Sequence, residues 1–162
     1  MDAAHRRRLL HRDLKPENIF LGDAEGAGTP KILDFGLVKP IALAEATQSS
    51  GQTGSGMLVG TLKYMSPEQF RGEKPAESWD LWALAVVSYE MLAGTHPFAA
   101  STPLDIRAAV LAGRVTPLRA HLPEAPAGWQ HFFAQALATR VELRPASALQ
   151  FFSEFKQSLG CP

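Results

Sequence analysis

The sequence is poor in cysteine, in net charge and in long hydrophobic runs, and each shortage excludes a class of protein. Cys161 is the only cysteine among 162 residues, which excludes an intrachain disulfide and a cysteine-based zinc site. The formal net charge is zero, so composition gives no reason to expect nucleic acid or an acidic membrane surface as partner. The longest apolar run, 81–87, is far too short for a membrane span, and the first residues lack the apolar core of a signal peptide. We therefore expect a cytoplasmic protein with no membrane segment.

The rest of the composition is that of an ordinary globular protein. Hydrophobic residues make up 46% and charged residues 20%, and the chain is long enough for one domain with a sizeable core. The basic run 6–8 is the exception. A solvated helix end and a nucleic-acid patch both fit this run, and we favour the helix end because short basic clusters are weak motifs.

Two short apolar runs near the start predict a small β-hairpin. Residues 19–21 and 31–33 flank the glycine-rich segment 22–30, which is typical of two strands joined by a turn. Residues 1–10 are interpreted as the last turns of a helix. The stretch TQSSGQTGSG at 47–56 is interpreted as a mobile loop.

The chain is predicted to be helical after this loop. Residues 79–93 are apolar on nearly all sides, with Ser78 and Gly94 as caps, so we expect this helix at the centre of the domain. A second helix begins with Thr102 as its cap and is closed by Gly113.

Apolar residues at helical spacing predict two further helices, the last of them opening at Pro145. We interpret both apolar stripes as core, not as a ligand site, because such spacing usually reflects packing. The stripes are Trp129, Phe132, Phe133, Ala136 and Leu137, and then Leu149, Phe152, Phe155 and Leu159. The fold class predicted is mainly α with a small β-hairpin.

The residues that suggest chemistry lie at the ends of the predicted hairpin. Asp13, Lys15 and Asn18 precede its first strand, and Asp34 follows its second. Carboxylate and amide oxygens suit a hard divalent cation that bridges phosphates. An aspartate beside a lysine suits the transfer of a phosphoryl group to a hydroxyl nucleophile. The transferring group carries negative charge spread over its oxygens, which suits a neighbouring lysine.

From about His5 to Phe155, the chain resembles the eukaryotic-type (Hanks-type) serine/threonine protein kinases, which contain residues of these kinds in the same order. The order and spacing of six motifs carry the resemblance. Ser66 stands before Pro67 where the family has alanine, and this serine resembles that of many bacterial members. The motifs are HRDLKPEN at 11–18, DFG at 34–36, GTLKYMSPEQ at 60–69, DLWALA at 80–85, GTHPF at 94–98 and RP at 144–145.

The resemblance implies a role for each matching residue of the site. Asp13 would accept or orient the proton of the substrate hydroxyl, and Lys15 would steady the γ-phosphate of ATP. Asn18 and Asp34 would hold Mg²⁺. Thr61 would bond to Asp13 and Lys15 and shape the floor of the substrate site. The implied cofactors are therefore ATP and Mg²⁺, and the implied partner is a protein with serine or threonine hydroxyls.

The resemblance also implies residues that hold the fold. Asp80 would hydrogen-bond the backbone of the turn formed by His11 and Arg12, because a carboxylate buried without partners is costly. Glu68 would pair with Arg144 and tie the activation segment to the helices behind it.

The activation segment implied by the resemblance is 34–68. Phe35 of its DFG motif would stack with His11 in an internal apolar column, with Gly36 completing the motif. Five hydroxyls of this segment are candidate phosphorylation sites, and Arg12 could bind a phosphate placed on one of them. A flexible linker with incidental hydroxyls fits the same composition. The candidates are Thr47, Ser49, Ser50, Thr53 and Ser55.

The N-terminal β-rich lobe of the family has no counterpart in this sequence. No G-x-G-x-x-G loop precedes a strand lysine, so half of the ATP site is expected to be absent. We interpret the chain as the C-terminal lobe of a kinase domain, 1–159, with the catalytic loop at 11–18 and a helical subdomain at 78–159. It would be a fragment or a reading frame begun at an internal methionine.

Two functions remain open on the sequence. The first is a serine/threonine protein kinase, a transferase, whose catalytic lobe is truncated here and inactive alone. The second is a non-catalytic kinase-like interaction module that exposes the apolar surface normally covered by the missing lobe. A DNA-binding helical protein rests only on residues 6–8, and we discount it. The substrate, the activating signal and the oligomeric state have no signature in the sequence.

Overall fold

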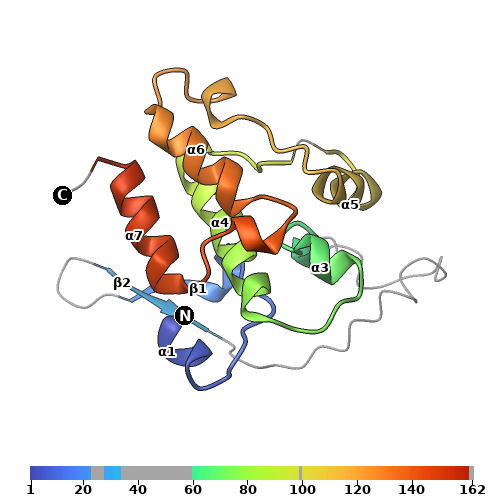
Figure 1. The fold of residues 1–162 in the computed structure, drawn as a ribbon, viewed down its shortest axis with the longest axis vertical. Helices are drawn as coiled ribbons and strands as arrows, with labels where there is room; N and C mark the ends of the chain where they lie inside the picture. Colours follow the sequence, from blue (N-terminus) through green and yellow to red (C-terminus); the bar gives the residue numbers. More distant parts are fainter. Residues whose placement is uncertain (23–27, 34–59, 99, 161–162) are drawn as a thin grey trace.

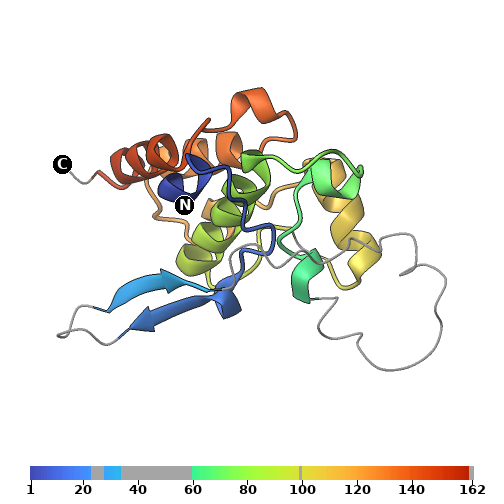
Figure 2. The same cartoon turned by 90° about the horizontal axis from the view of Figure 1, so that it is seen from below.

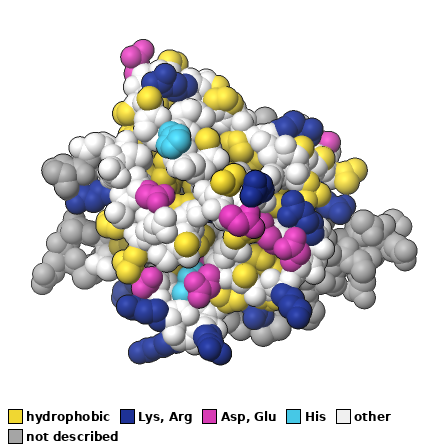
Figure 3. Space-filling model, viewed as in Figure 1, with side chains coloured by type: hydrophobic (Ala, Val, Ile, Leu, Met, Phe, Trp, Pro, Cys, Tyr) yellow, Lys and Arg dark blue, Asp and Glu magenta, His cyan; other side chains and the backbone are white. Residues whose placement is uncertain are grey.

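The computed structural model describes residues 1–22, 28–33, 60–98 and 100–160. Helices pack around one central helix, α4, and the one two-stranded hairpin of these described residues lies in the lower left of the view, above α1 (Figure 1). Seen from below, the hairpin projects from one side of the helical body (Figure 2). On the face shown in Figure 3, acidic and basic side chains are interspersed, with hydrophobic side chains between them. Within the described residues, the prediction of a mainly α fold with a small hairpin is confirmed.

Helix α4, Glu77–Ala93, forms the centre of the domain because most of its surface is apolar. Trp82, Val86 and Tyr89 are fully buried, so the predicted central position is confirmed. The helix ends at Gly94, whose left-handed backbone (φ 66°) lets its N–H bond the Glu90 carbonyl at 2.8 Å. The predicted start is wrong by two residues. Ser78 lies inside the helix, and the N-cap Ala76 makes no side-chain cap.

Three longer helices follow α4 along the chain, and side-chain caps start the first and the last of them, whereas the middle one begins after Pro126 without a side-chain cap. Helix α5, Pro103–Leu111, begins where the Thr102 hydroxyl accepts the Asp105 N–H at 3.2 Å, as predicted. Helix α6, Ala127–Ala136, packs on α4 and on helix α7, Ala148–Ser158. The Ser147 hydroxyl caps α7 by accepting the Gln150 N–H at 3.1 Å. The predicted start of this helix at Pro145 is therefore wrong by three residues.

The apolar stripe predicted for α7 is also wrong in part. Leu149 and Phe152 are 61% and 63% exposed, whereas Phe151 is buried against Phe132 of α6 with ring centroids 5.0 Å apart. Phe155 does contact both Phe132 and Phe133. Phe151 and Phe152 are adjacent, and either can share a helix face with Phe155, at a spacing of four or of three residues. The position of α6 decides between them, because Phe132 of α6 contacts Phe151.

The hairpin joins strand β1, Ile19–Gly22, to strand β2, Thr29–Ile32, in antiparallel register with Ile19 opposite Ile32. The predicted hairpin is confirmed, although its second strand begins two residues earlier than expected. The Leu33 N–H donates to the Asn18 carbonyl at 2.8 Å, next to the pair of Ile19 and Ile32. The strand pairing therefore continues to Asn18, one of the predicted site residues.

Short elements complete the described chain. Helix α1 covers only Asp2–His5, because the chain then turns through Arg8, whose backbone is left-handed (φ 58°). The predicted helix over residues 1–10 is thus shorter than expected. The remaining elements are helix α3, Pro67–Phe70, and the 3₁₀ turns η1, Pro16–Asn18, η2, Leu118–Ala120, and η3, Val141–Leu143. Within the described ranges, no helix combines the length and apolar character needed to cross a membrane.

Candidate active site

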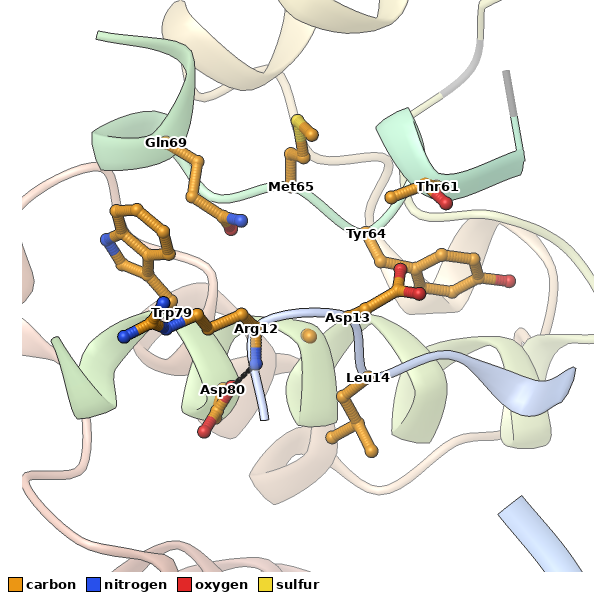
Figure 4. Close-up of a pocket in the computed structure, with 10 residues that line it drawn as sticks. Arg12, Asp13, Leu14, Thr61, Tyr64, Met65, Gln69, Trp79 and Asp80 are labelled. Atoms are coloured by element: carbon orange, nitrogen blue, oxygen red, sulfur yellow. Dashed lines mark hydrogen bonds between the residues drawn. The ribbon is translucent and has the colours of Figure 1, made fainter. Parts of the chain in front are cut away.

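The loop at 11–18 is held against the central helix by one buried carboxylate. Asp80 of α4 accepts the His11 N–H through Oδ2 and the Arg12 N–H through Oδ1, both at 2.8 Å. Figure 4 draws the second of these bonds. Arg12 has a left-handed backbone (φ 66°), a conformation that costs a non-glycine residue roughly 1–3 kcal/mol. The two hydrogen bonds to Asp80 offset this strain, so the contact expected from the sequence is present and fixes the turn.

The turn at Arg12 presents three polar side chains to one another. Lys15 Nζ lies 3.2 Å from Asp13 Oδ2 and donates to Thr61 Oγ1 at 3.1 Å. Asn18 Nδ2 donates to the Asp13 carbonyl at 2.7 Å. The structure thus brings together residues 13, 15 and 18 of the loop with Thr61, which is 46 positions from Lys15.

This arrangement combines a proton acceptor with a cation. The Asp13 carboxylate can accept a proton from a hydroxyl, and the Lys15 ammonium beside it can stabilise negative charge that develops on a neighbouring group. Both side chains are mostly buried, which strengthens their electrostatic interactions relative to those in water.

Asn18 has the chemistry of a ligand for a hard cation. Because its Nδ2 faces the Asp13 carbonyl, its Oδ1 lies on the opposite side of the amide and makes no hydrogen bond within the described residues. An amide oxygen is a ligand that Mg²⁺ accepts. The described ranges contain no group of three or more His, Cys, Asp or Glu side chains that could hold a metal, and Asp34 lies outside them.

A small cavity lies behind the loop, between it and helices α3 and α4 (Figure 4). Asp13, Thr61, Tyr64 and Trp79 line part of it. The cavity is lined both by the loop and by the segment that begins at residue 60. Thr61 of that segment also accepts the hydrogen bond from Lys15.

The expected pair of Glu68 and Arg144 is present and buried. Arg144 donates from Nη2 and Nη1 to the two carboxylate oxygens of Glu68, at 2.6 and 3.0 Å. Its Nε donates to the Ala138 carbonyl at 2.7 Å, and its guanidinium lies over the Trp82 ring, 4.7 Å from the centroid. Ser66 and Gln69 form a capping box that starts α3 and places Glu68 within it. The pair therefore joins α3 to the chain before α7.

Comparison with known proteins shows the family of the chain. Residues 1–154 match the protein kinase domain. The chain belongs to the protein kinase domain family. It is 38% identical over 164 aligned residues to a serine/threonine-protein kinase of Myxococcus xanthus, covering 99% of this chain and 22% of that protein. It is also 35% identical, over 93% of its length, to a protein of Bifidobacterium longum named probable serine/threonine-protein kinase PknB.

A third relative gives the same result. Serine/threonine-protein kinase PknL of Mycobacterium tuberculosis is 36% identical over 147 residues, which cover 91% of this chain. The chain spans 21% of the Bifidobacterium protein and 35% of PknL, so it corresponds to about a fifth to a third of these relatives. The resemblance to bacterial serine/threonine kinases that the motifs indicated is confirmed.

Several residues predicted for the kinase site lie outside the described residues. They are Asp34, Phe35 and Gly36 of the DFG motif, and the candidate phosphorylation sites Thr47, Ser49, Ser50, Thr53 and Ser55. Their predicted roles stay predictions.

Two contacts of the kinase domain were not predicted. His5 Nε2 lies 2.9 Å from Asp80 Oδ2 in a hydrogen bond, and the Tyr64 hydroxyl donates to Glu90 Oε2 at 2.8 Å. Burial first, and then the bond to Glu90 and its charge, raise the pKa of Tyr64 well above its ordinary value. Burial also raises the pKa of Tyr89, whose hydroxyl donates to the Thr116 carbonyl at 2.9 Å.

These two tyrosines predict a loss of stability in alkali. Above pH of about 10 the unfolded chain releases the phenol protons that the folded chain still holds, so the free energy of unfolding falls as pH rises. Tyr64→Phe removes one such proton, and we expect a shallower decline in that variant. Urea unfolding from about pH 8 to about pH 11 measures the slope. A decline in Tyr64→Phe as steep as in the unmodified chain would contradict the shift.

Proposed function

We propose that the chain is the catalytic lobe of a serine/threonine protein kinase, with residues 1–159 forming the C-terminal lobe of the kinase domain. In this proposal, 11–18 is the catalytic loop, 34–68 the activation segment and 78–159 the helical subdomain. The family match supports the proposal, as do the helical fold with its single hairpin in the described residues and the absence of a G-x-G-x-x-G loop from the sequence.

The observation that carries the proposal is the cluster of Asp13, Lys15 and Thr61. Asp13 accepts the proton of the substrate hydroxyl as that oxygen attacks the γ-phosphorus of ATP and the bond to the leaving oxygen breaks. Lys15 stabilises the charge on the transferring group. Thr61 holds the Lys15 ammonium at 3.1 Å and so keeps it beside the Asp13 carboxylate. Positioning and charge stabilisation of this kind provide most of the catalysis in phosphoryl transfer.

The proposed cofactors follow from the family, which generally uses ATP and Mg²⁺. Asn18 would hold the metal through Oδ1, together with Asp34. Mg²⁺ bound with ATP neutralises charge on the phosphates. The proposed substrates are serine and threonine hydroxyls of proteins, because the loop has the form DLKPEN and the relatives are named serine/threonine kinases. A cytoplasmic location and a switch by phosphorylation between 47 and 55 stay predictions.

The test is transfer of γ-phosphate from labelled ATP to a mixture of peptides that contain serine and threonine. We expect measurable transfer when the chain is joined to the N-terminal lobe of a characterised protein kinase, and none from the 162 residues alone, because adenine and the inner phosphates lack a binding site. A joined protein that binds Mg-ATP yet transfers no phosphate contradicts the catalytic proposal.

An interaction module remains the second candidate, and one observation favours it. Phe20 and Leu21 of the hairpin are 57% and 65% exposed, and Leu9 and Leu33 are exposed as well. Apolar surface of this kind suits coverage by a partner. A module of this type would bind apolar dyes and would not bind Mg-ATP. Calorimetry with Mg-ATP and the chain alone distinguishes the two, because tight binding would argue against a purely non-catalytic module.

A further inference from the structure

His96, in the loop after α4, lies against the segment that carries Thr61. Its Nε2 is 3.0 Å from the carbonyl oxygen of Lys63, which is 33 positions earlier in the chain. The rings of His96 and Tyr64 meet edge to face, with centroids 6.1 Å apart at 82°. Lys63 belongs to a turn, 61–64, in which the Tyr64 N–H bonds the Thr61 carbonyl at 3.2 Å. His96 therefore contacts this turn at its backbone and at a side chain.

The two ring nitrogens of His96 have different partners. A carbonyl oxygen only accepts hydrogen bonds, so Nε2 is the N–H that donates to Lys63. In the neutral ring Nδ1 carries no proton, and it accepts the Phe98 N–H at 3.2 Å. The Phe98 carbonyl is also 3.2 Å from Nδ1 and would accept its proton in the charged ring. The bond from Nε2 to Lys63 therefore forms in both states of the ring.

The loop that carries His96 is anchored in the core. Phe98 is 1% exposed and stacks on the Trp82 ring of α4, with centroids 5.7 Å apart at 16°. The Pro97 carbonyl accepts the Thr116 N–H at 2.7 Å. Because Phe98 also bonds Nδ1, the imidazole ring is held in place relative to α4. His96 thus links the turn to the core of the domain.

We propose that His96 is a positioning residue for phosphoryl transfer, which fixes the turn through the Lys63 carbonyl and so places the Thr61 hydroxyl. This inference rests on the function proposed above. Thr61 Oγ1 accepts a hydrogen bond from Lys15 Nζ at 3.1 Å, and that nitrogen lies 3.2 Å from the Asp13 carboxylate. Movement of the turn would break the bond to Thr61, and the Lys15 ammonium would lose a contact that keeps it beside the transferring group.

Two substitutions separate the two contacts of the ring. In His96→Gln the amide nitrogen reaches about as far as Nε2, so it can still donate to the Lys63 carbonyl. In His96→Asn the amide oxygen takes the place of Nδ1 and can still accept the Phe98 N–H, but the side chain is too short to reach Lys63. The glutamine variant therefore keeps the contact with the turn, and the asparagine variant keeps the contact within the loop.

Amide hydrogen exchange in the 162-residue chain, followed by NMR, tests the contact without catalysis. The Tyr64 and Met65 amides bond carbonyl groups of the turn. We expect both to exchange roughly two- to tenfold faster in His96→Asn than in the unmodified chain, as for one lost hydrogen bond, while Phe98 keeps its rate. His96→Gln should give the reverse pattern, with faster exchange at Phe98 alone.

Faster exchange of all three amides in both variants would mean that His96 only adds stability to the domain, and would overturn the inference. Unchanged exchange of Tyr64 and Met65 in His96→Asn would overturn it as well. A further measurement needs no variant and so decides even if one of them fails to fold. The nitrogen chemical shifts of the neutral His96 ring should place its proton on Nε2, whereas a proton on Nδ1 would rule out the bond to Lys63.

The second test measures transfer in the chain joined to an N-terminal lobe. We expect His96→Asn to lower kcat roughly two- to tenfold, the usual effect of one neutral hydrogen bond, and His96→Gln to retain kcat. The KM for Mg-ATP should stay unchanged in both variants.

A double-mutant cycle with Thr61→Val tests the route of the effect. Because His96 acts through Thr61, His96→Asn should lower kcat less in the Thr61→Val background than in the unmodified one. An equal loss in both backgrounds contradicts the positioning role. If the joined protein transfers no phosphate in any form, the proposed function fails, while the exchange pattern still reports on the contact between His96 and the turn.

Discussion

Replacing Asp13 by asparagine is expected to lower the rate of phosphoryl transfer roughly 10²- to 10⁴-fold, the usual contribution of a positioned proton acceptor. Asparagine keeps the size and polarity of the side chain, so it can still lie beside Lys15 Nζ, which is 3.2 Å from Asp13 Oδ2. It cannot accept the hydroxyl proton at neutral pH. The loss should therefore appear in kcat, measured in the joined protein under saturating Mg-ATP.

The matched control for this variant is Glu142→Gln. Glu142 is an exposed carboxylate of η3 whose contact is with an exposed arginine, so its loss of charge should leave transfer unchanged. Circular dichroism of both variants checks that the helices persist. An Asp13→Asn protein that keeps the unmodified rate would exclude Asp13 as the proton acceptor.

The second large effect is expected at the buried pair of Glu68 and Arg144. Glu68→Gln leaves the arginine charge buried and without its carboxylate partner, and breaking such a pair costs about 3–5 kcal/mol. The side chains are only 4% and 2% exposed, so solvent screens the interaction little. Urea unfolding should show a lower transition midpoint with a similar slope.

The exposed pair of Arg71 and Glu73 provides the control for the buried one. These side chains are 43% and 49% exposed at 3.4 Å, and Glu73→Gln should cost about 0–1 kcal/mol. The double variant Glu68→Gln with Arg144→Met removes the orphaned charge and should recover part of the loss. If Glu68→Gln is no more destabilising than Glu73→Gln, the pair does not tie α3 to the helices behind it.

The sequence predicted the parts of this domain that depend on local chemistry. The hairpin followed from two apolar runs around glycines. The end of α4 followed from Gly94, because glycine lacks a Cβ and adopts the left-handed backbone that closes a helix at no steric cost. The contact of Asp80 with the loop was expected from the motifs, since a buried carboxylate needs donors.

Features that depend on tertiary packing were predicted less well. The sequence suggested Leu149 and Phe152 as core, but α6 selects the stripe that contains Phe151. The partner of His5 was missed for a related reason. A histidine near the end of a short helix carries no sequence signal for a carboxylate 75 positions away, and only the packing of α1 on α4 brings them together.

The central claim is that this chain carries the residues that transfer phosphate to serine and threonine. Its most direct test is the identity of the phosphorylated amino acids after incubation of the joined protein with labelled ATP and a protein substrate. We expect label in phosphoserine and phosphothreonine, and almost none when Asp13 is replaced by asparagine. Absence of label despite Mg-ATP binding, or equal label with Asp13→Asn, would contradict the account.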